Sequence, residues 1–147
     1  MADIIELSSS DEINAAADLL TLMYDEQSRD DLHKQITDMV AEGWHLIGIM
    51  NENSQCMATV MYYVGTRLFC GKYLQSESLF IHPEARRKGY SSDLFDWLEA
   101  KAKQLQCDRI FLHSFVENAN GHKFFYAQGY SIRGFAINKI LTDKYAS

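Results

Sequence analysis

The chain has 147 residues, of which 47% are hydrophobic and 23% are charged, and its formal net charge is −6. These values predict one folded domain spanning residues 1–147, and no apolar run approaches the roughly 20 residues of a membrane-spanning helix. The negative charge argues against a nucleic-acid partner, because nucleic-acid affinity depends largely on phosphate neutralisation, and it is compatible with a cationic substrate.

The first part of the chain predicts a strand followed by two helices. Residues 3–7 alternate in a way that favours a strand. The patterns Ser9-x-x-Glu12 and Ser28-x-x-Asp31 each mark the start of a helix. Apolar residues follow at helical spacing until Gly43, and the acidic connector 24–27 joins the two helices.

From residue 44 onward the apolar pattern changes to that of strands. Residues 44–50 and 55–64 predict two strands joined by a turn at 51–54, and a further turn is expected at 65–67. The next stretch, 68–81, is too long for one regular strand. We therefore expect a turn or bulge at Gly71 or Ser76.

Residues 78–98, SLFIHPEARRKGYSSDLFDWL, predict a buried strand, a sharp loop and an amphipathic helix. The strand ends at His82-Pro83, because proline cannot donate to a following ladder. A glycine-containing loop before a helix directs backbone N–H groups and the positive end of the helix dipole toward one place, which favours phosphate binding. A basic surface turn that only starts a helix would share this pattern, and the loop matches neither the Walker nor the dinucleotide fingerprint.

The last part of the chain predicts a strand at 108–113, a helix at 118–128 ended by Gly129, and a final strand at 130–141. Together the elements predict an α/β (α+β) fold. Its central mixed, mostly antiparallel and twisted sheet would have six to seven strands, flanked by about four helices.

The cysteines and histidines indicate no metal or disulfide framework. Cys56, Cys70 and Cys107 are an odd number with no Cys-x-x-Cys pair, so buried free thiols in a reducing cytoplasm explain them best. The acidic N-terminal sequence lacks the order of a signal peptide. The histidines show no zinc-ligand spacing, so no metal site is expected.

Two segments in register resemble the GNAT superfamily of N-acetyltransferases. Residues 77–91, ESLFIHPEARRKGYS, are similar to the acetyl-CoA-binding motif of that family, and residues 118–130, NANGHKFFYAQGY, to its Asn-x-x-Ala-x-x-Phe-Tyr segment. The order of predicted elements is also similar, so the resemblance covers nearly the whole chain. It implies a GNAT-like fold and acetyl-CoA as co-substrate.

The resemblance also implies a set of site residues. The backbone of Leu79 to Ile81 would pair with the pantetheine arm, and the loop and helix start would hold the pyrophosphate. The aromatic residues of the second segment would line the acetyl end, although part of that stripe would also suit a core. The implied cofactor-binding residues are Leu79, Phe80, Ile81, Arg86, Arg87, Lys88, Gly89, Tyr90, Ser91, Ser92, Asn118, Gly121, Phe124 and Phe125.

Three positions depart from the family pattern. Ser91 replaces a glycine or alanine and is small enough to let a phosphate approach. Gly121 replaces alanine, which we expect to be harmless for packing. Phe125 falls where the family usually has a tyrosine that serves as general acid. Neighbouring Tyr126 is a candidate for that role, although adjacent helix residues point about 100° apart.

The reaction that the resemblance implies needs a base more than an acid. A lysine-like amine with a pKa of about 10.4 is only about 0.04% neutral at pH 7, so deprotonating it costs roughly 4.6 kcal/mol. The expelled thiolate, with a pKa near 8.5, needs only about 2 kcal/mol of stabilisation. Glu77 is the candidate base, because many family members place a carboxylate there. An exposed strand glutamate without a catalytic role is the alternative.

The expected activity is direct acetyl transfer to a primary amine of a small molecule or a protein. A CoA-binding sensor or interaction module without turnover is the alternative, and a domain that binds another phosphate ligand is a third reading. The substrate would lie near the two N-terminal helices, the connector 24–29 and Glu77. Exposed edge strands in so small a sheet would also suit a homodimer.

Overall fold

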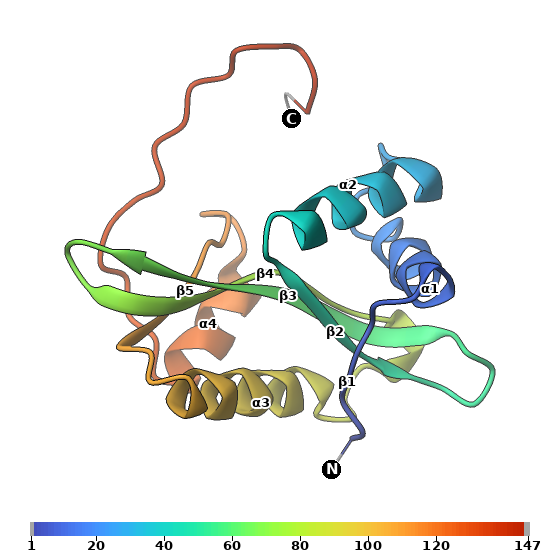
Figure 1. The fold of residues 1–147 in the computed structure, drawn as a ribbon, viewed down its shortest axis with the longest axis horizontal. Coiled ribbons are helices and arrows are strands. Elements are labelled where there is room, and N and C mark those ends of the chain that lie inside the picture. The colour runs from blue at the N-terminus through green and yellow to red at the C-terminus, as the bar shows by residue number, and fades with distance from the viewer. Residues whose placement is uncertain (1, 146–147) are drawn as a thin grey trace. The chain divides into compact units, whose positions relative to one another are not determined.

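The computed structural model describes residues 2–145, which form two compact units, one ending at Leu112 and the other beginning at His113. Figure 1 labels the helices and strands. The first unit contains β1 (Ile5–Glu6), α1 (Ser10–Leu20), α2 (Arg29–Ala41), β2 (His45–Met50), β3 (Cys56–Arg67), β4 (Gly71–Ile81), the 3₁₀ turn η1 (Pro83–Ala85), α3 (Tyr90–Gln104) and β5 (Arg109–Leu112). The second unit contains α4 (Ala119–Ala127).

The two N-terminal helices begin where their capping patterns predict. The Ser9 hydroxyl accepts from the Glu12 N–H at 3.1 Å, and the Glu12 carboxylate accepts from the Ser9 N–H at 3.0 Å. Ser28 and Asp31 exchange the same pair of hydrogen bonds at the start of α2. Both capping boxes satisfy backbone donors that a helix start otherwise leaves unpaired.

The five strands of the first unit form one sheet in the order β1-β2-β3-β4-β5. Neighbouring strands run antiparallel except β4 and β5, which are parallel. The prediction of a mixed, mostly antiparallel sheet is therefore confirmed. The predicted six to seven strands are not, because the residues described contain five.

The hairpin between β3 and β4 differs from the prediction. β3 continues to Arg67, so no turn lies at 65–67, and the chain reverses at residues 68–70. Gly71, at φ +80°, begins β4, so the turn expected at Gly71 lies immediately before it. The bulge in β4 lies two residues beyond Ser76, because Met61 pairs with Glu77 while Thr59 pairs with Phe80. Ser78 and Leu79 therefore lie opposite the single residue Val60.

The sheet of the first unit is covered on both faces. Helices α1 and α2 lie on one side of it and α3 on the other (Figure 1). The α1–α2 side holds a cluster that includes Ala17, Leu20 and Leu46. On the other side α3 buries Leu94 and Leu98, which are fully inaccessible. This burial of apolar stripes at helical spacing is the main force that fixes the elements around β4.

In the second unit the predicted last strand is wrong. Residues 130–141 form no strand, and the apolar side chains after Tyr130 are exposed, with Phe135 83% and Ile137 95% accessible. Alternation is necessary for a half-buried strand, but a strand also needs a hydrogen-bonded neighbour. The helix predicted at 118–128 is confirmed as α4, and the Asn118 side chain caps it by accepting from the Gly121 N–H at 3.1 Å.

Candidate functional site

The loop between β4 and α3 has the sharp geometry that its glycine and proline predict. After Ile81, η1 is held by the His82 ring, which accepts from the Glu84 N–H at 3.0 Å. The chain then takes two left-handed conformations, Arg87 at φ +68° and Gly89 at φ +79°. Residues 86–89 are exposed, so the three adjacent cations of this loop lie at the surface immediately before α3.

The N-terminus of α3 differs from those of the other three α-helices in the described residues. Side chains cap α1, α2 and α4, whereas Gly89 at the start of α3 offers none and no side-chain cap bond is made. A Cβ built on Gly89 would have nothing within 4 Å. The first-turn N–H groups of Tyr90 to Ser92 have no partner within the helix and lie at the positive end of a helix of 15 residues, and all three residues are half-buried.

Strand β4 runs past the end of its parallel neighbour. The last pair between β4 and β5 joins Ser76 and Leu112, yet β4 continues to Ile81. The bulge at Ser78 and Leu79 falls just after this point and turns β4 away from regular pairing. The predicted residues Leu79, Phe80 and Ile81 thus lie on a half-buried strand segment that leads directly into the loop.

The connector between α1 and α2 contacts this same segment. The Tyr24 hydroxyl lies 2.9 Å from the Ser78 hydroxyl, and both residues are half-buried. The structure therefore brings the connector, the bulge and Glu77 into one region of the first unit. Sequence reasoning missed Ser78 as a contact of Tyr24, because the two residues lie 54 positions apart and neither belongs to a motif that pairs them.

Glu77 is exposed and pairs with Met61 of β3. Met61 is part of the cluster beneath α1 and α2, so the Glu77 side chain leaves the sheet on the face that these helices cover in part. This position fits the predicted role of a carboxylate near the connector.

The predicted residues of the second segment lie on α4, in the second unit. Phe124 and Phe125 are half-buried, with ring centroids 5.6 Å apart, and Phe125 lies 6.1 Å from Tyr130. Tyr126 is 54% exposed. Because these residues belong to a different unit, their approach to the β4 segment stays a prediction.

Gly121 lies close to the side chain of Asn118, and the harmlessness of its exchange for alanine stays a prediction. A Cβ at this position would overlap the Asn118 side-chain amide, whose oxygen caps α4. The amide is the end of a flexible side chain and can shift, and the equivalent caps of α1 and α2 form with Glu12 and Asp31 at the matching position. The cap of α4 shows that the side-chain oxygen of Asn118 is already engaged with its own helix.

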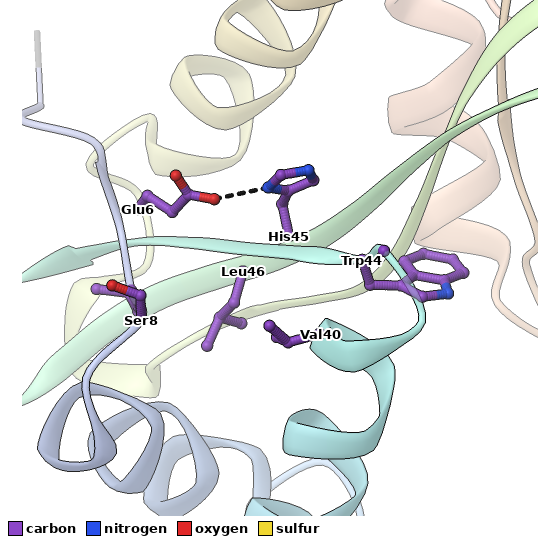
Figure 2. Close-up of a pocket in the computed structure, with 8 residues that line it drawn as sticks. Glu6, Ser8, Val40, Trp44, His45 and Leu46 are labelled. Carbon is purple, nitrogen blue, oxygen red and sulfur yellow. Dashed lines mark hydrogen bonds and ion pairs between the residues drawn. The ribbon is translucent and has the colours of Figure 1, made fainter.

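A concavity of about 220 Å³ lies elsewhere, where β1 leaves β2 and turns into α1 (Figure 2). Its lining includes Trp44 and the close contact between His45 and Glu6, whose Nδ1 and Oε1 atoms are 2.7 Å apart. Burial raises the pKa of neighbouring Tyr62, and the charge of Glu6 adds to this shift. The concavity contains none of the predicted site residues and lies at the β1–β2 edge, away from the loop.

Two kinds of feature are absent from the part of the chain that the structure describes. No cluster of three or more potential ligands among histidine, cysteine, aspartate and glutamate is present between residues 2 and 145. No helix within these residues has the length and apolar character needed to cross a membrane. The cysteines are free, with Cys56 buried and both Cys70 and Cys107 only partly buried, so the expectation of three buried thiols holds for one of them.

Several solved structures share this fold. The glucosamine-6-phosphate N-acetyltransferase of Arabidopsis thaliana aligns with a TM-score of 0.73 and 21% identity, over 95% of this chain and 98% of that one. A transcriptional regulator from Bacillus halodurans has a TM-score of 0.83 and 16% identity, over 96% and 100% of the two chains. AAC(6')-Iy, in complex with the bisubstrate analog CoA-S-monomethyl-acetylneamine, has a TM-score of 0.78 and 14% identity, over 95% and 97%.

No curated protein sequence is significantly similar to the chain. The model of the acetyltransferase (GNAT) family, however, matches residues 13–130, which include most of α1, all of α2, the sheet from β2 onward, the loop before α3 and all of α4. The match thus includes both segments that carried the resemblance, and the chain belongs to the GNAT family of acetyltransferases.

Proposed function

We propose that this protein is a cytoplasmic, single-domain N-acetyltransferase that moves an acetyl group from acetyl-CoA directly onto a primary amine. The observation that carries the proposal is the uncapped N-terminus of α3. In a member of this family, backbone donors without a side-chain cap, behind a left-handed glycine and beside three cations, would form a site for a pyrophosphate.

The residues of the first unit fit this co-substrate. The N–H groups of residues 87–92 would hold the pyrophosphate, and the side chains of Arg86, Arg87 and Lys88 would add positive potential. The backbone of Leu79, Phe80 and Ile81 would pair with the pantetheine arm like an added strand, because β4 extends beyond its β5 partner. Acetyl-CoA supplies the acetyl group as a thioester.

The chain's own groups would manage the protons and the developing charge. Glu77 would take the proton from the acceptor amine, directly or through water. Deprotonation of the amine costs more free energy than stabilisation of the leaving thiolate, so this is the more important of the two proton transfers. The N–H of Leu79 at the bulge would donate to the developing oxyanion. Tyr126 or water would donate a proton to the leaving thiolate, since Phe125 carries no acidic group.

The acceptor is an amine that is cationic before it reacts. Asp25 and Glu26 in the connector and Asp30 at the start of α2 are exposed and would attract such a group. Both a small-molecule amine and a protein amine fit this charge. The net charge of −6 also favours an amine over nucleic acid or a membrane surface, and the edge strands of the sheet suit a homodimer.

A CoA-binding protein without turnover is the second candidate. Two observations favour it: Phe125 replaces the usual tyrosine, and a transcriptional regulator shares the fold with a TM-score of 0.83. It predicts binding of CoA without thiol release in the presence of any amine. The acetyltransferase predicts CoA binding and also thiol release when a suitable amine is present.

The first experiment is a thermal melt with and without acetyl-CoA. Ligand at about 100 times its dissociation constant should add about 2.7 kcal/mol to the folded state, a shift of several degrees for a domain of this size. Gly89→Leu should lose this shift, because a side chain there would occupy the open space before α3. Gly129→Leu is the matched control, since Gly129 has φ +92° and its Cβ would also meet nothing within 4 Å.

The outcomes separate the readings. A shift in the wild type and in the Gly129 variant, but not in the Gly89 variant, supports the site and justifies a screen of amines by thiol release. No shift at millimolar acetyl-CoA would refute the proposed function. A shift with simple nucleotides but not with CoA would instead favour the third reading.

The role of Glu77 is tested by Glu77→Gln. We expect kcat to fall by at least about 100-fold near neutral pH, the lower range for a general base, with part of the loss recovered at high pH, where more of the amine is neutral. A rate equal to that of the wild type at every pH would end the assignment of Glu77 as the base.

A further inference from the structure

Ser78 adopts a conformation that serine rarely takes. Its φ is +59°, in the left-handed region, and it lies at the bulge where Ser78 and Leu79 oppose one residue of β3. A left-handed residue with a Cβ costs roughly 1–2 kcal/mol, and bulges of this kind usually place glycine there. The surrounding structure must therefore hold Ser78 in place.

The contact that holds it comes from a distant element. The Tyr24 hydroxyl lies 2.9 Å from the Ser78 hydroxyl, in a partly buried setting. Tyr24 is itself fixed, because its ring packs against the cluster between the sheet and helices α1 and α2, and its N–H donates to Leu20 at 2.9 Å. The hydrogen bond thus connects Tyr24, which the core holds in place, to Ser78, which has an unfavourable backbone conformation.

The hydrogen bond joins the region proposed to bind the acceptor amine to the region proposed to carry out acyl transfer. Tyr24 begins the connector that carries the exposed acidic residues Asp25 and Glu26. Ser78 lies between Glu77 and Leu79. The Glu77 side chain is the group proposed to act on the amine, and the Leu79 backbone N–H is the group proposed to act on the acyl oxygen. A displacement of the connector would therefore change the geometry of the bulge.

We propose that Tyr24 is a positioning residue, whose hydroxyl holds Ser78 in the left-handed bulge and so aligns Glu77 and the Leu79 N–H for acyl transfer. The alignment depends on the connector, so an acceptor that orders the connector also orders the acyl site. This inference rests on the proposed function, but its structural part does not.

The test combines Tyr24→Phe with Ser78→Gly. Tyr24→Phe removes the hydroxyl alone, and we expect kcat to fall about tenfold, the equivalent of one lost hydrogen bond, with a smaller change in KM. Ser78→Gly removes the cost of the left-handed conformation, because glycine adopts positive φ freely. The double variant should therefore recover most of the lost kcat.

Matched controls are available in the chain. Ser54 is also a left-handed serine, at φ +61° in the turn before β3, so Ser54→Gly should not rescue Tyr24→Phe. Tyr63→Phe removes another half-buried tyrosine hydroxyl and should leave kcat unchanged. If Tyr24 instead donated a proton, Ser78→Gly would not rescue and the alkaline limb of the pH profile would move; either result would overturn the positioning role.

Hydrogen exchange provides a readout that needs no activity. In Tyr24→Phe the amides of residues 77–81 should exchange several-fold faster, and Ser78→Gly should restore their protection. Unchanged exchange in Tyr24→Phe would refute the inference even if the enzyme is active. Faster exchange in a protein that binds no acetyl-CoA would refute the proposed function, and with it the link to acyl transfer, while leaving the structural bond established.

Discussion

Lys72 and Asp108 exchange hydrogen bonds at the start of the parallel strand pair. The Lys72 N–H donates to the Asp108 carboxylate at 3.1 Å, and the Asp108 N–H donates to the Lys72 carbonyl at 2.7 Å. These bonds fix the register of β4 and β5 at one end. The strands can therefore separate only at the other end, next to the bulge at Ser78.

Removing the Asp108 carboxylate should weaken this register. We expect Asp108→Ala to lower the free energy of unfolding by about 1–2 kcal/mol, because the Lys72 N–H loses a charged acceptor. Asp108→Asn keeps an acceptor oxygen and should cost less. Urea denaturation of the three proteins measures the difference, and equal midpoints for the wild type and the alanine variant would contradict this role.

Gly71 should not tolerate alanine. Its φ is +80°, and a Cβ there would lie 2.5 Å from the Asp108 carboxylate oxygen. We expect Gly71→Ala to lower the free energy of unfolding by more than the roughly 1–2 kcal/mol of the left-handed conformation alone. Gly129→Ala has the same conformational cost without the contact, so a comparable loss in both variants would show that the contact is unimportant.

The capping box of α1 makes stability depend on acid pH. Hydrogen bonds from the backbone N–H groups of Ser9 and Ser8 lower the pKa of the Glu12 carboxyl below its ordinary value. Its contribution is therefore complete above the unfolded pKa of about 4.3, and it is lost as the pH falls through the lowered folded pKa.

Glu12→Gln should accordingly be less stable than the wild type near pH 7, by less than about 1 kcal/mol for so exposed a group. The difference should shrink as the pH falls below about 4.3. Chemical denaturation at pH 7 and at lower pH measures it. A difference that stays constant across this range would contradict a role for the carboxylate charge.

Cys56 should resist alkylation in the folded protein. Burial raises the pKa of its thiol to about 12, so almost none of the reactive thiolate is present at pH 8. Cys70, which is partly exposed, should react first. Peptide mapping by mass spectrometry after brief iodoacetamide treatment tests this order, and labelling in denaturant should include all three cysteines.

The face of α3 that packs on the sheet should be sensitive to truncation. Leu98 is fully inaccessible, so Leu98→Ala should lower the free energy of unfolding by 2–5 kcal/mol through lost burial and the cavity left behind, a range typical of buried leucine. Leu68 is fully exposed at the β3–β4 hairpin, and Leu68→Ala should change stability by less than about 0.5 kcal/mol.

The features that sequence predicted best are those with local causes. The capping boxes at Ser9 and Ser28 involve residues three positions apart, and both helices begin there. The loop before α3 depends on Pro83 and Gly89, whose backbone preferences are intrinsic. For the same reason the loop that we propose as the cofactor site could be located within the sequence.

The features that sequence missed depend on residues far apart in the chain. The bulge at Ser78 follows from how β4 pairs with β3, and nothing in the local sequence distinguishes Ser78 from Ser76. The Tyr24–Ser78 bond joins an ordinary connector to that bulge. The last strand failed as a prediction because alternation alone does not supply a neighbouring strand.

The exposed segment 130–141 has a consequence for handling the protein. Its sequence, YSIRGFAINKIL, combines alternating apolar residues with only two charges, Arg133 and Lys139. Short, accessible segments of this kind nucleate intermolecular β-structure and are commonly restrained by such charges. Replacing both cations with neutral residues should therefore lower the concentration at which the purified protein precipitates, because these two charges oppose association of the segment with other copies.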